Sequence, residues 1–410
     1  MSVHNNGPFK SNRRQVLAGL AAAGLTSVFP LAARSQSTIK VGVIVPLSGP
    51  NAQFGINARN GIELVTDSIN ANGGIQGLGG AKIELVIADA TSSPVTAAST
   101  AHRMISTNQV CAVLGAFVSS LTIAISEVTE RRGIPLLTMS FSDKITARGF
   151  KSVFQFVPKA STFGRAQFDG TMAIAKRAGD PISRIAIAYE DTAYGTSQAT
   201  GLRAAAKDAG VQVVMDEAYP LGITDVTPLI NRLRATEAQV LFPCSYLNDS
   251  LLIIRAMRLQ GIDIPAVGGS AGYVIPDFVQ ALGEYAEGVL SVNPGNDDLA
   301  PELTDSFRKK FGYFMVHEAI EHAVTLDVLV QAINQAKSAK PASIRETLAS
   351  TKFCQGWTKA MPGGCVEFDE QGLNKVAFPI MVQWQGGKLV TVHPDSVAKH
   401  APIWKGKTVR

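Results

Sequence analysis

Residues 41–55 read VGVIVPLSGPNAQFG, and this stretch joins a short apolar run to a turn and to the beginning of a helix. The apolar run covers residues 39–45 and has the length and continuity of a strand that is buried on both faces. The turn PLSGPN follows, and a helical pattern continues from about residue 55 to residue 70. A buried strand, a short loop and a helix form the first unit of a parallel α/β sheet.

The same alternation continues along the chain and then starts a second time. In the first half we expect strands at residues 82–88, 112–114 and 135–138, with helices at 94–106 and 119–130. In the second half we expect strands at 184–189, 212–216, 240–243 and 266–268, with helices at 197–209, 226–235 and up to about 259. Two more helices are expected at about 300–311 and 319–336. Repeated strand–helix units with short loops predict an α/β protein with two doubly wound parallel-sheet lobes.

The loops after the strands are the candidate ligand site. Open parallel sheets bind ligands beyond the carboxyl ends of their strands, where helix N-termini present unpaired N–H groups that favour an anion. Two such sheets facing each other would enclose a small molecule. The first lobe would contribute residues 48–54, 117–120 and 140–142, and the second would contribute Tyr194, Ser245, Tyr246 and Ser270.

The first 36 residues are typical of an export signal. A polar start contains Arg13 and Arg14, and an Ala- and Gly-rich apolar stretch follows at residues 16–33. This pattern predicts a secretory signal, with the twin-arginine route favoured over the Sec route because of the paired arginines. The sequence therefore predicts a periplasmic protein. Without these residues the 38 basic side chains fall to 34 against 33 acidic ones, which argues against a nucleic-acid partner.

The four cysteines divide into two kinds. Cys354 and Cys365 flank a short segment that contains the turn PGG at residues 362–364, and a disulfide there suits an oxidising compartment. Cys111 and Cys244 each lie at a strand-like apolar run, so we expect them to be buried free thiols.

Several motifs carry a resemblance to a known family. They are VGVIVPLSGPNAQFG (41–55), INANGGIQG (69–77), GAFVSS (115–120), ITARGF (145–150), AYG (193–195) and FDEQGLNK (368–375). In this order and spacing the sequence resembles the Leu/Ile/Val-binding protein family, the solute-binding proteins of branched-chain amino acid ABC transporters. The resemblance implies a type I periplasmic-binding fold with three crossings between the lobes. Lobe 1 would comprise residues 38–157 plus 293–377, and lobe 2 would comprise residues 158–292 plus 378–410.

The resemblance also implies the roles of the site residues. Ser119, Ser140 and Ser142 match positions that hold the ligand's α-carboxylate, although the residues alone would also allow helix caps. Phe54, Tyr194 and Tyr246 match aromatic residues that contact the ligand, with packing as the alternative for the tyrosines, and Phe117 in the predicted loop would complete the aromatic wall.

One position departs from the family. Ser270 occupies the place of the glutamate that binds the ligand's ammonium, unless the alignment slips and Asp191 or Asp249 serves as the acid. We therefore expect a small carboxylate or amide with an apolar or aromatic body, and weak binding of free leucine, isoleucine or valine.

Enzyme motifs are missing from the sequence. It contains no GxSxG, Walker loop, HExxH or paired Cys/His set, and His317 and His322 are five residues apart, so we interpret both as structural. The sequence predicts a monomeric, non-enzymatic protein without a cofactor, which closes about its ligand by a hinge and delivers it to the membrane permease of an ABC transporter. A ligand-sensing module that signals to a separate partner is the alternative.

Overall fold

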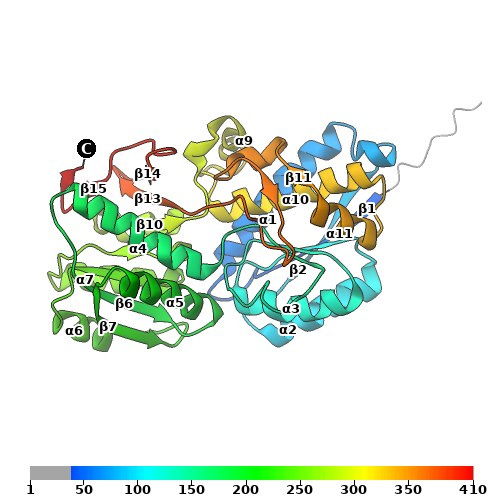
Figure 1. Ribbon diagram of the computed structural model, residues 1–410. Helices are drawn as coiled ribbons and strands as arrows, with labels where there is room; N and C mark the ends of the chain where they lie inside the picture. Colours follow the sequence, from blue (N-terminus) through cyan, green and yellow to red (C-terminus); the bar gives the residue numbers. More distant parts are fainter. Residues whose placement is uncertain (1–37, 410) are drawn as a thin grey trace, which may run out of the picture. The chain divides into compact units, whose positions relative to one another are not determined.

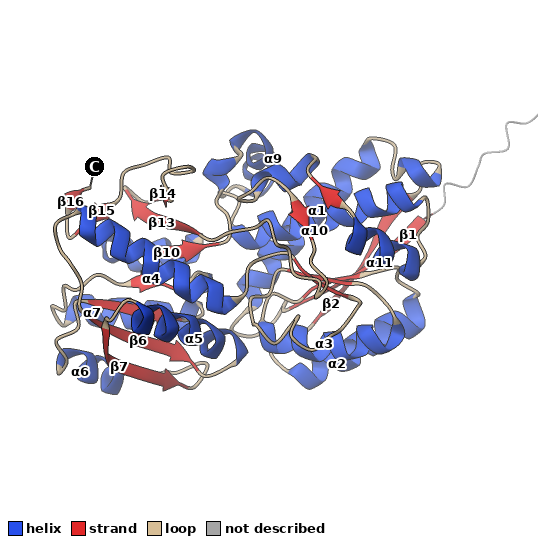
Figure 2. Cartoon of the chain, in the orientation of Figure 1, coloured by secondary structure: helices blue, strands red, loops and turns tan. Residues whose placement is uncertain are grey.

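The computed structural model describes residues 38–409, which form one compact unit. The predicted export signal at residues 1–36 lies outside the described residues. Two main sheets, the first wholly parallel and the second mixed, are each flanked by helices and organise the chain (Figures 1 and 2). We refer to each sheet with its helices as the first and the second lobe.

The first sheet is entirely parallel, in the order β2-β1-β3-β4-β5. Its strands are β1 (Thr38–Val45), β2 (Lys82–Asp89), β3 (Val113–Gly115), β4 (Leu136–Thr138) and β5 (Val153–Gln155). Five consecutive residues of β1, from Val41 to Val45, are buried, as expected for a strand covered on both faces. The predicted parallel sheet is confirmed in this lobe.

Helices cover both faces of this sheet. They are α1 (Ala52–Ala71), α2 (Pro94–Arg103), α3 (Ser119–Arg132), α9 (Pro301–Phe311), α10 (His317–Ala336) and α11 (Pro341–Ser350). α1 packs against α10, and α2 packs against α3 (Figure 1). Gly61 permits the close approach of α1 to α10, because a Cβ there would lie 2.2 Å from the Ala319 carbonyl oxygen.

The second sheet is parallel at its centre and antiparallel at one edge. β6 (Arg184–Glu190) lies between β7 (Gln212–Tyr219) and β8 (Val240–Cys244), and a parallel bridge from Leu241 to Ala266 leads on to β9 (Val267–Gly268). The order continues through β10 (Leu290–Asn293), β13 (Ile380–Gln385) and β14 (Lys388–His393). The last two strands form an antiparallel hairpin that the sequence did not predict. Its tight turn places Gly386 and Gly387 at φ of 57° and 73°, a conformation that glycine adopts readily.

Five helices flank the second sheet: α4 (Ala160–Arg177), α5 (Ala193–Asp208), α6 (Thr227–Arg234), α7 (Leu247–Leu259) and α8 (Pro276–Leu282). The chain passes between the sheets three times, after β5, after β10 and before β13. The limits of the two lobes stay a prediction, and the expected boundary at residue 293 falls on the last residue of β10.

The cysteines occupy two kinds of environment. A disulfide joins Cys354 to Cys365 between β11 (Lys352–Phe353) and β12 (Val366–Glu367), with an S–S distance of 2.07 Å. Cys111 and Cys244 are buried free thiols, as the sequence predicts. Burial raises the pKa of the Cys111 thiol to about 12, which makes it unreactive.

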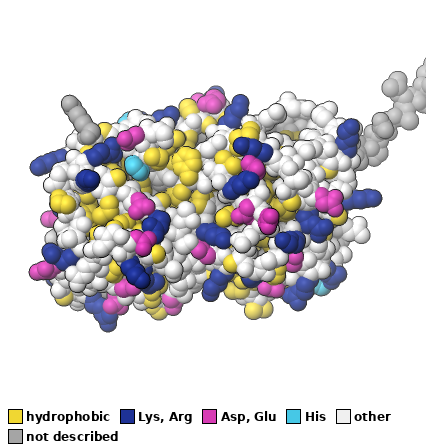
Figure 3. Space-filling view, viewed as in Figure 1, with side chains coloured by type: hydrophobic (Ala, Val, Ile, Leu, Met, Phe, Trp, Pro, Cys, Tyr) yellow, Lys and Arg dark blue, Asp and Glu magenta, His cyan; other side chains and the backbone are white. Residues whose placement is uncertain are grey.

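The surface carries both signs of charge. Figure 3 shows acidic and basic side chains interspersed over one face of the molecule. Within residues 38–409, no helix combines the length and the hydrophobicity that a bilayer crossing requires.

Candidate ligand-binding site

Hydroxyl groups tie together the loops after β3 and β4 in the first lobe. Thr122 Oγ1 accepts the N–H of Ala116 at 3.0 Å and lies 2.6 Å from Ser140 Oγ, which donates to the Phe117 carbonyl at 2.8 Å. Ser119 Oγ accepts the N–H of Ser142 at 3.1 Å. All these side chains are buried. We call this set the loop network: Thr122 with Ser119, Ser140 and Ser142.

The three predicted serines have different roles in this network. Ser119 is the first residue of α3; its hydroxyl oxygen accepts from Ser142, and its hydroxyl proton has no acceptor among the described residues. The Ser140 hydroxyl contacts Thr122, Thr138 and the Phe117 carbonyl, so it supports the loop. Ser142 Oγ lies 3.2 Å from Ser197 Oγ on α5, which is a direct contact between the lobes.

Six rings from both lobes form an aromatic cluster beside the loop network. Its members are Phe54, Phe117, Phe141, Tyr194, Tyr246 and His317, all at most 5% exposed. Phe54 stacks on Phe117 with ring centroids 4.5 Å apart, and Tyr246 meets both edge-on. Tyr194 lies 5.4 Å from Tyr246 and 6.0 Å from Phe141. Phe117 has a left-handed backbone with φ of 67°, which is strained for a bulky residue and typical of functional sites.

The two tyrosines are positioned by the starts of α5 and α7. Tyr194 donates its hydroxyl proton to the Gly269 carbonyl, and the Tyr246 hydroxyl is close enough to the Ser119 backbone in the first lobe for that backbone to lower its pKa slightly against the effect of burial. Gly195 follows Tyr194 because a Cβ at this position would lie 2.2 Å from the Glu190 carbonyl oxygen. The Glu190 carboxylate accepts the N–H groups of Thr192 and Gly195, which fixes the first turn of α5.

The predicted position for an ammonium-binding acid holds a serine that is satisfied within the protein. Ser270 is fully buried, its N–H donates to Ser291 Oγ at 2.9 Å, and its hydroxyl donates to Asn293 Oδ1 at 3.1 Å. Asp191 is exposed and accepts the N–H of Leu221.

Asp249 is the buried acid of the second lobe. Burial, with the charge of Glu190 nearby, raises its pKa to about 7. Backbone groups of Tyr246, Asp249 and Gly222 partly offset this rise in the pKa, and Oδ2 has no partner among the described residues. Asp249 lies in the first turn of α7, three residues after Tyr246 of the aromatic cluster.

The model of the periplasmic binding protein family matches residues 38–388. The chain belongs to the periplasmic binding protein family. Leu/Ile/Val-binding protein homolog 7 of Brucella suis is 32% identical, over 92% of this chain and 97% of that protein. Homolog 8 of Brucella abortus is also 32% identical, over 94% and 97%. The resemblance to the Leu/Ile/Val-binding protein family is thus confirmed.

Solved structures show the same fold. The branched-chain amino acid transporter substrate binding protein LivJ of Streptococcus pneumoniae, in complex with isoleucine, matches this binding protein with a TM-score of 0.77 at 24% identity, covering 87% of this chain and all of that one. An ABC transporter solute binding protein of R. palustris, in complex with benzoate, matches with a TM-score of 0.75 at 20% identity, covering 87% and 96%. The type I periplasmic-binding fold is confirmed.

One residue of the candidate site escaped the sequence analysis. Phe141 lies within the predicted loop 140–142, whereas His317 comes from α10, and its ring lies 6.1 Å from Phe117 and 6.2 Å from Phe141. We had interpreted His317 as structural. The missed signal is compositional: the first turns of α10 read HEAIEH, and four ionisable residues in a buried helix are unusual.

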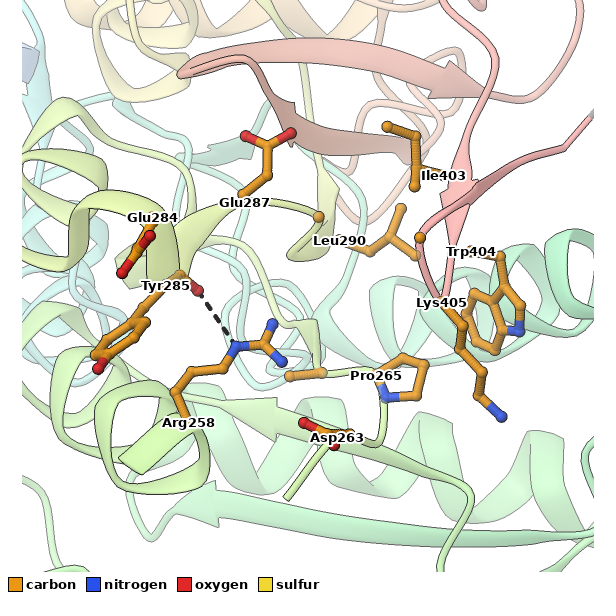
Figure 4. Close-up of a pocket in the computed structure, with 13 residues that line it drawn as sticks. Arg258, Asp263, Pro265, Glu284, Tyr285, Glu287, Leu290, Ile403, Trp404 and Lys405 are labelled. Atoms are coloured by element: carbon orange, nitrogen blue, oxygen red, sulfur yellow. Dashed lines mark hydrogen bonds between the residues drawn. The ribbon is translucent and has the colours of Figure 1, made fainter. Parts of the chain in front are cut away.

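A separate surface cavity of about 570 Å³ lies in the second lobe (Figure 4). Pro265 and Leu290 line it near the amino ends of β9 and β10, together with Arg258, Glu287 and Lys405. Ligands of parallel sheets bind at the carboxyl ends of strands. The aromatic cluster and the loop network, which follow the carboxyl ends of strands, therefore stay the candidate ligand site.

Proposed function

We propose that this protein is an exported solute-binding protein of an ABC uptake transporter, and that it captures a small carboxylate with an apolar or aromatic body. One observation carries the proposal: the free hydroxyl of Ser119, at the N-terminus of α3, lies beside an aromatic cluster built by both lobes. Family membership supports the solute-binding role, which needs neither a catalytic residue nor a cofactor.

The first lobe supplies the groups that would bind the ligand's carboxylate. The N-terminus of a helix favours an anion through its unpaired N–H groups and its dipole. Ser119 and Ser142 add hydroxyls at this terminus, and Ser140 holds their loops in place. Hydrogen bonds from such donors to a charged carboxylate are among the strong ones in proteins.

The aromatic cluster supplies the body of the site, and Ser270 argues against an ammonium at the position where the family places its acid. Ser270 offers no negative charge, and burying an ammonium without a partner costs several kcal/mol. Related folds are recorded with isoleucine and with benzoate, so the architecture accommodates both kinds of ligand. For this chain the ligand that fits best resembles benzoate more than leucine in its charge.

Capture would proceed by hinge closure, which shifts the population from open to closed lobes. The contact from Ser142 to Ser197 joins the lobes across the site, and under this mechanism it would form on closure. The closed form would then dock on the transporter's membrane permease.

Isothermal titration calorimetry with benzoate, pentanoate, phenylacetamide and leucine tests the proposal. Ser119→Ala should weaken the bound carboxylate by about 1.5–3 kcal/mol, the scale of a hydrogen bond to a charged group. Ser120→Ala, at the less buried neighbouring position, is the control. Submicromolar binding of leucine together with no binding of any carboxylate that lacks an amine would overturn the proposed ligand class.

A further inference from the structure

The first turns of α10 contain buried polar groups that have no partner. His317 is 1% exposed and Glu318 is fully buried. His317 Nε2 and both carboxylate oxygens of Glu318 lack hydrogen-bond partners among the described residues. Buried polar groups in folded proteins are almost always paired, so an unpaired set calls for a ligand or another occupant.

These groups lie at the site and not elsewhere in the core. The His317 ring belongs to the aromatic cluster through its contacts with Phe117 and Phe141. Its Nε2 lies 3.8 Å from Glu318 Oε2, too far for a hydrogen bond. Asp277, in the first turn of α8, is close enough to act electrostatically on Glu318, so the second lobe also borders this place.

The other nitrogen of the ring is already occupied. Glu321, one turn further along α10, holds His317 Nδ1 at 3.1 Å through Oε2. His322 Nδ1 accordingly turns away and bonds to the Glu318 carbonyl. Glu321 therefore orients the imidazole, and Nε2 is left as the ring's free polar atom.

We infer that His317 Nε2 and Glu318 form a second polar subsite, which binds a hydroxyl group carried on the body of the ligand. The inference rests on the proposed function and narrows its ligand class to hydroxylated carboxylates. One oxygen atom fits within about 2.8 Å of two atoms that are 3.8 Å apart.

A ligand hydroxyl can bond to both His317 Nε2 and Glu318 in either protonation state of the imidazole ring and the carboxyl group. If Glu321 donates to Nδ1, Nε2 carries a proton, and the ligand hydroxyl accepts from it and donates to Glu318. If Nδ1 donates to Glu321, Nε2 accepts from the hydroxyl and a protonated Glu318 donates to it. Burial, which raises the pKa of Glu318 well above its usual value, allows the second arrangement. An ammonium only donates, so it fits fewer of these states.

Calorimetry with matched ligand pairs tests the inference. The pairs are benzoate with 3- and 4-hydroxybenzoate, and pentanoate with 5-hydroxypentanoate; 4-(aminomethyl)benzoate is the cationic comparison. For the wild-type protein, at least one hydroxylated member should bind 10-fold or more tightly than its parent. His317→Phe, which keeps an aromatic ring, and Glu318→Gln should each reduce that ratio below about threefold while the parent compound still binds.

His322→Phe is the matched control, because His322 Nε2 also lacks a partner among the described residues, while the ring contacts of α10 with the aromatic cluster are made by His317. His322→Phe should leave the ratio of the affinities for the hydroxylated and the parent compound unchanged. Binding of the parent compound shows that each variant is folded. The proposed subsite is wrong if the parent carboxylates bind as tightly as their hydroxylated partners, or if the preference for the hydroxylated compound survives both His317→Phe and Glu318→Gln. It is also wrong if 4-(aminomethyl)benzoate binds more tightly than the hydroxybenzoates. In those three cases the proposed function stands; if no carboxylate binds at all, the proposed function fails and the subsite with it.

Discussion

Two buried polar clusters border the same aromatic rings, and they differ in how their hydrogen bonds are used. In the loop network, the Thr122, Ser140 and Ser142 side chains all have partners within the protein. At the start of α10, Glu318 and the far nitrogen of His317 have none among the described residues. A satisfied cluster fixes the shape of a site, whereas an unsatisfied one costs stability until a ligand completes it.

Asp249 extends this comparison to the second lobe and gives the largest expected effect. Burial raises its pKa from the ordinary 3.8 of an aspartic acid to about 7, so the folded state binds more protons than the unfolded state between these pH values. Stability contributed by the protonated acid is therefore lost as the pH rises through this window.

Asp249→Asn removes the titrating carboxyl and with it the fall in the free energy of unfolding as the pH rises. The variant should gain on the order of 2–4 kcal/mol over the wild type at pH 8, and almost nothing near pH 3.5. Urea unfolding across this pH range measures the difference. Asp191→Asn, at an exposed acid of the same lobe, is the control and should follow the wild type at every pH. A gain that does not depend on pH would show that Asp249 is not the titrating group.

Thr122→Val breaks the satisfied cluster with almost no change in shape. It removes the acceptor of the Ala116 N–H and the contact with Ser140, and it leaves a buried donor unpaired. We expect a loss of about 2–3 kcal/mol in the free energy of unfolding, measured in urea. Thr129→Val on the same helix is the matched control, because that buried hydroxyl bonds only to the Ser126 carbonyl one turn earlier. Equal losses in the two variants would remove the special role of the loop network.

Glu318→Met removes the unpaired carboxylate at the start of α10. Unlike Thr122→Val, it is expected to increase the free energy of unfolding. Replacing a buried acid that lacks partners by an apolar side chain of similar size should raise the free energy of unfolding by about 1–2 kcal/mol. The gain should grow as the pH rises above 4.5, because the raised pKa of Glu318 makes the folded wild type retain a proton that the unfolded chain releases. Glu346→Met, at an exposed position on α11, should change stability by less than about 0.5 kcal/mol. Destabilisation by Glu318→Met would show that Glu318 has a structural partner.

The sequence predicted the elements that follow a simple period and missed those that depend on distant parts of the chain. The strand at 39–45 and the helix beginning near residue 55 match β1 and α1, because an apolar run and a helical repeat are local signals. The hairpin of β13 and β14 pairs with β10, almost 90 residues earlier, and no local pattern encodes that pairing.

The same distinction applies to the site. Phe54, Phe117, Tyr194 and Tyr246 do meet, because each follows the carboxyl end of a strand, where sheet topology brings loops together. His317 comes from a helix that reaches the site only through its packing on α1 and the first sheet. Its role depends on tertiary structure, which residue spacing does not reveal.

Ser197 gives the smallest expected effect and tests the comparison at the junction of the lobes. Its hydroxyl donates to the Ala193 carbonyl within α5 and lies 3.2 Å from Ser142 Oγ of the loop network. The first contact lies within one helix of the second lobe, whereas the second joins the two lobes and, under the proposed hinge closure, forms only in the closed state. Ser197→Ala should therefore leave the free energy of unfolding nearly unchanged and weaken ligand binding by about 0.5–1 kcal/mol, the value of one ordinary hydrogen bond.

Thr200→Ala, on the next turn of α5, is the control, because its hydroxyl bonds only to its own helix. It should change neither the free energy of unfolding nor the affinity for the ligand. Calorimetry with the carboxylate that binds most tightly measures the affinity of both variants, and urea unfolding measures their stability. If Ser197→Ala lowers stability and leaves affinity intact, the hydroxyl belongs to the helix alone, and the loop network ends at Ser142 without helping the lobes to close.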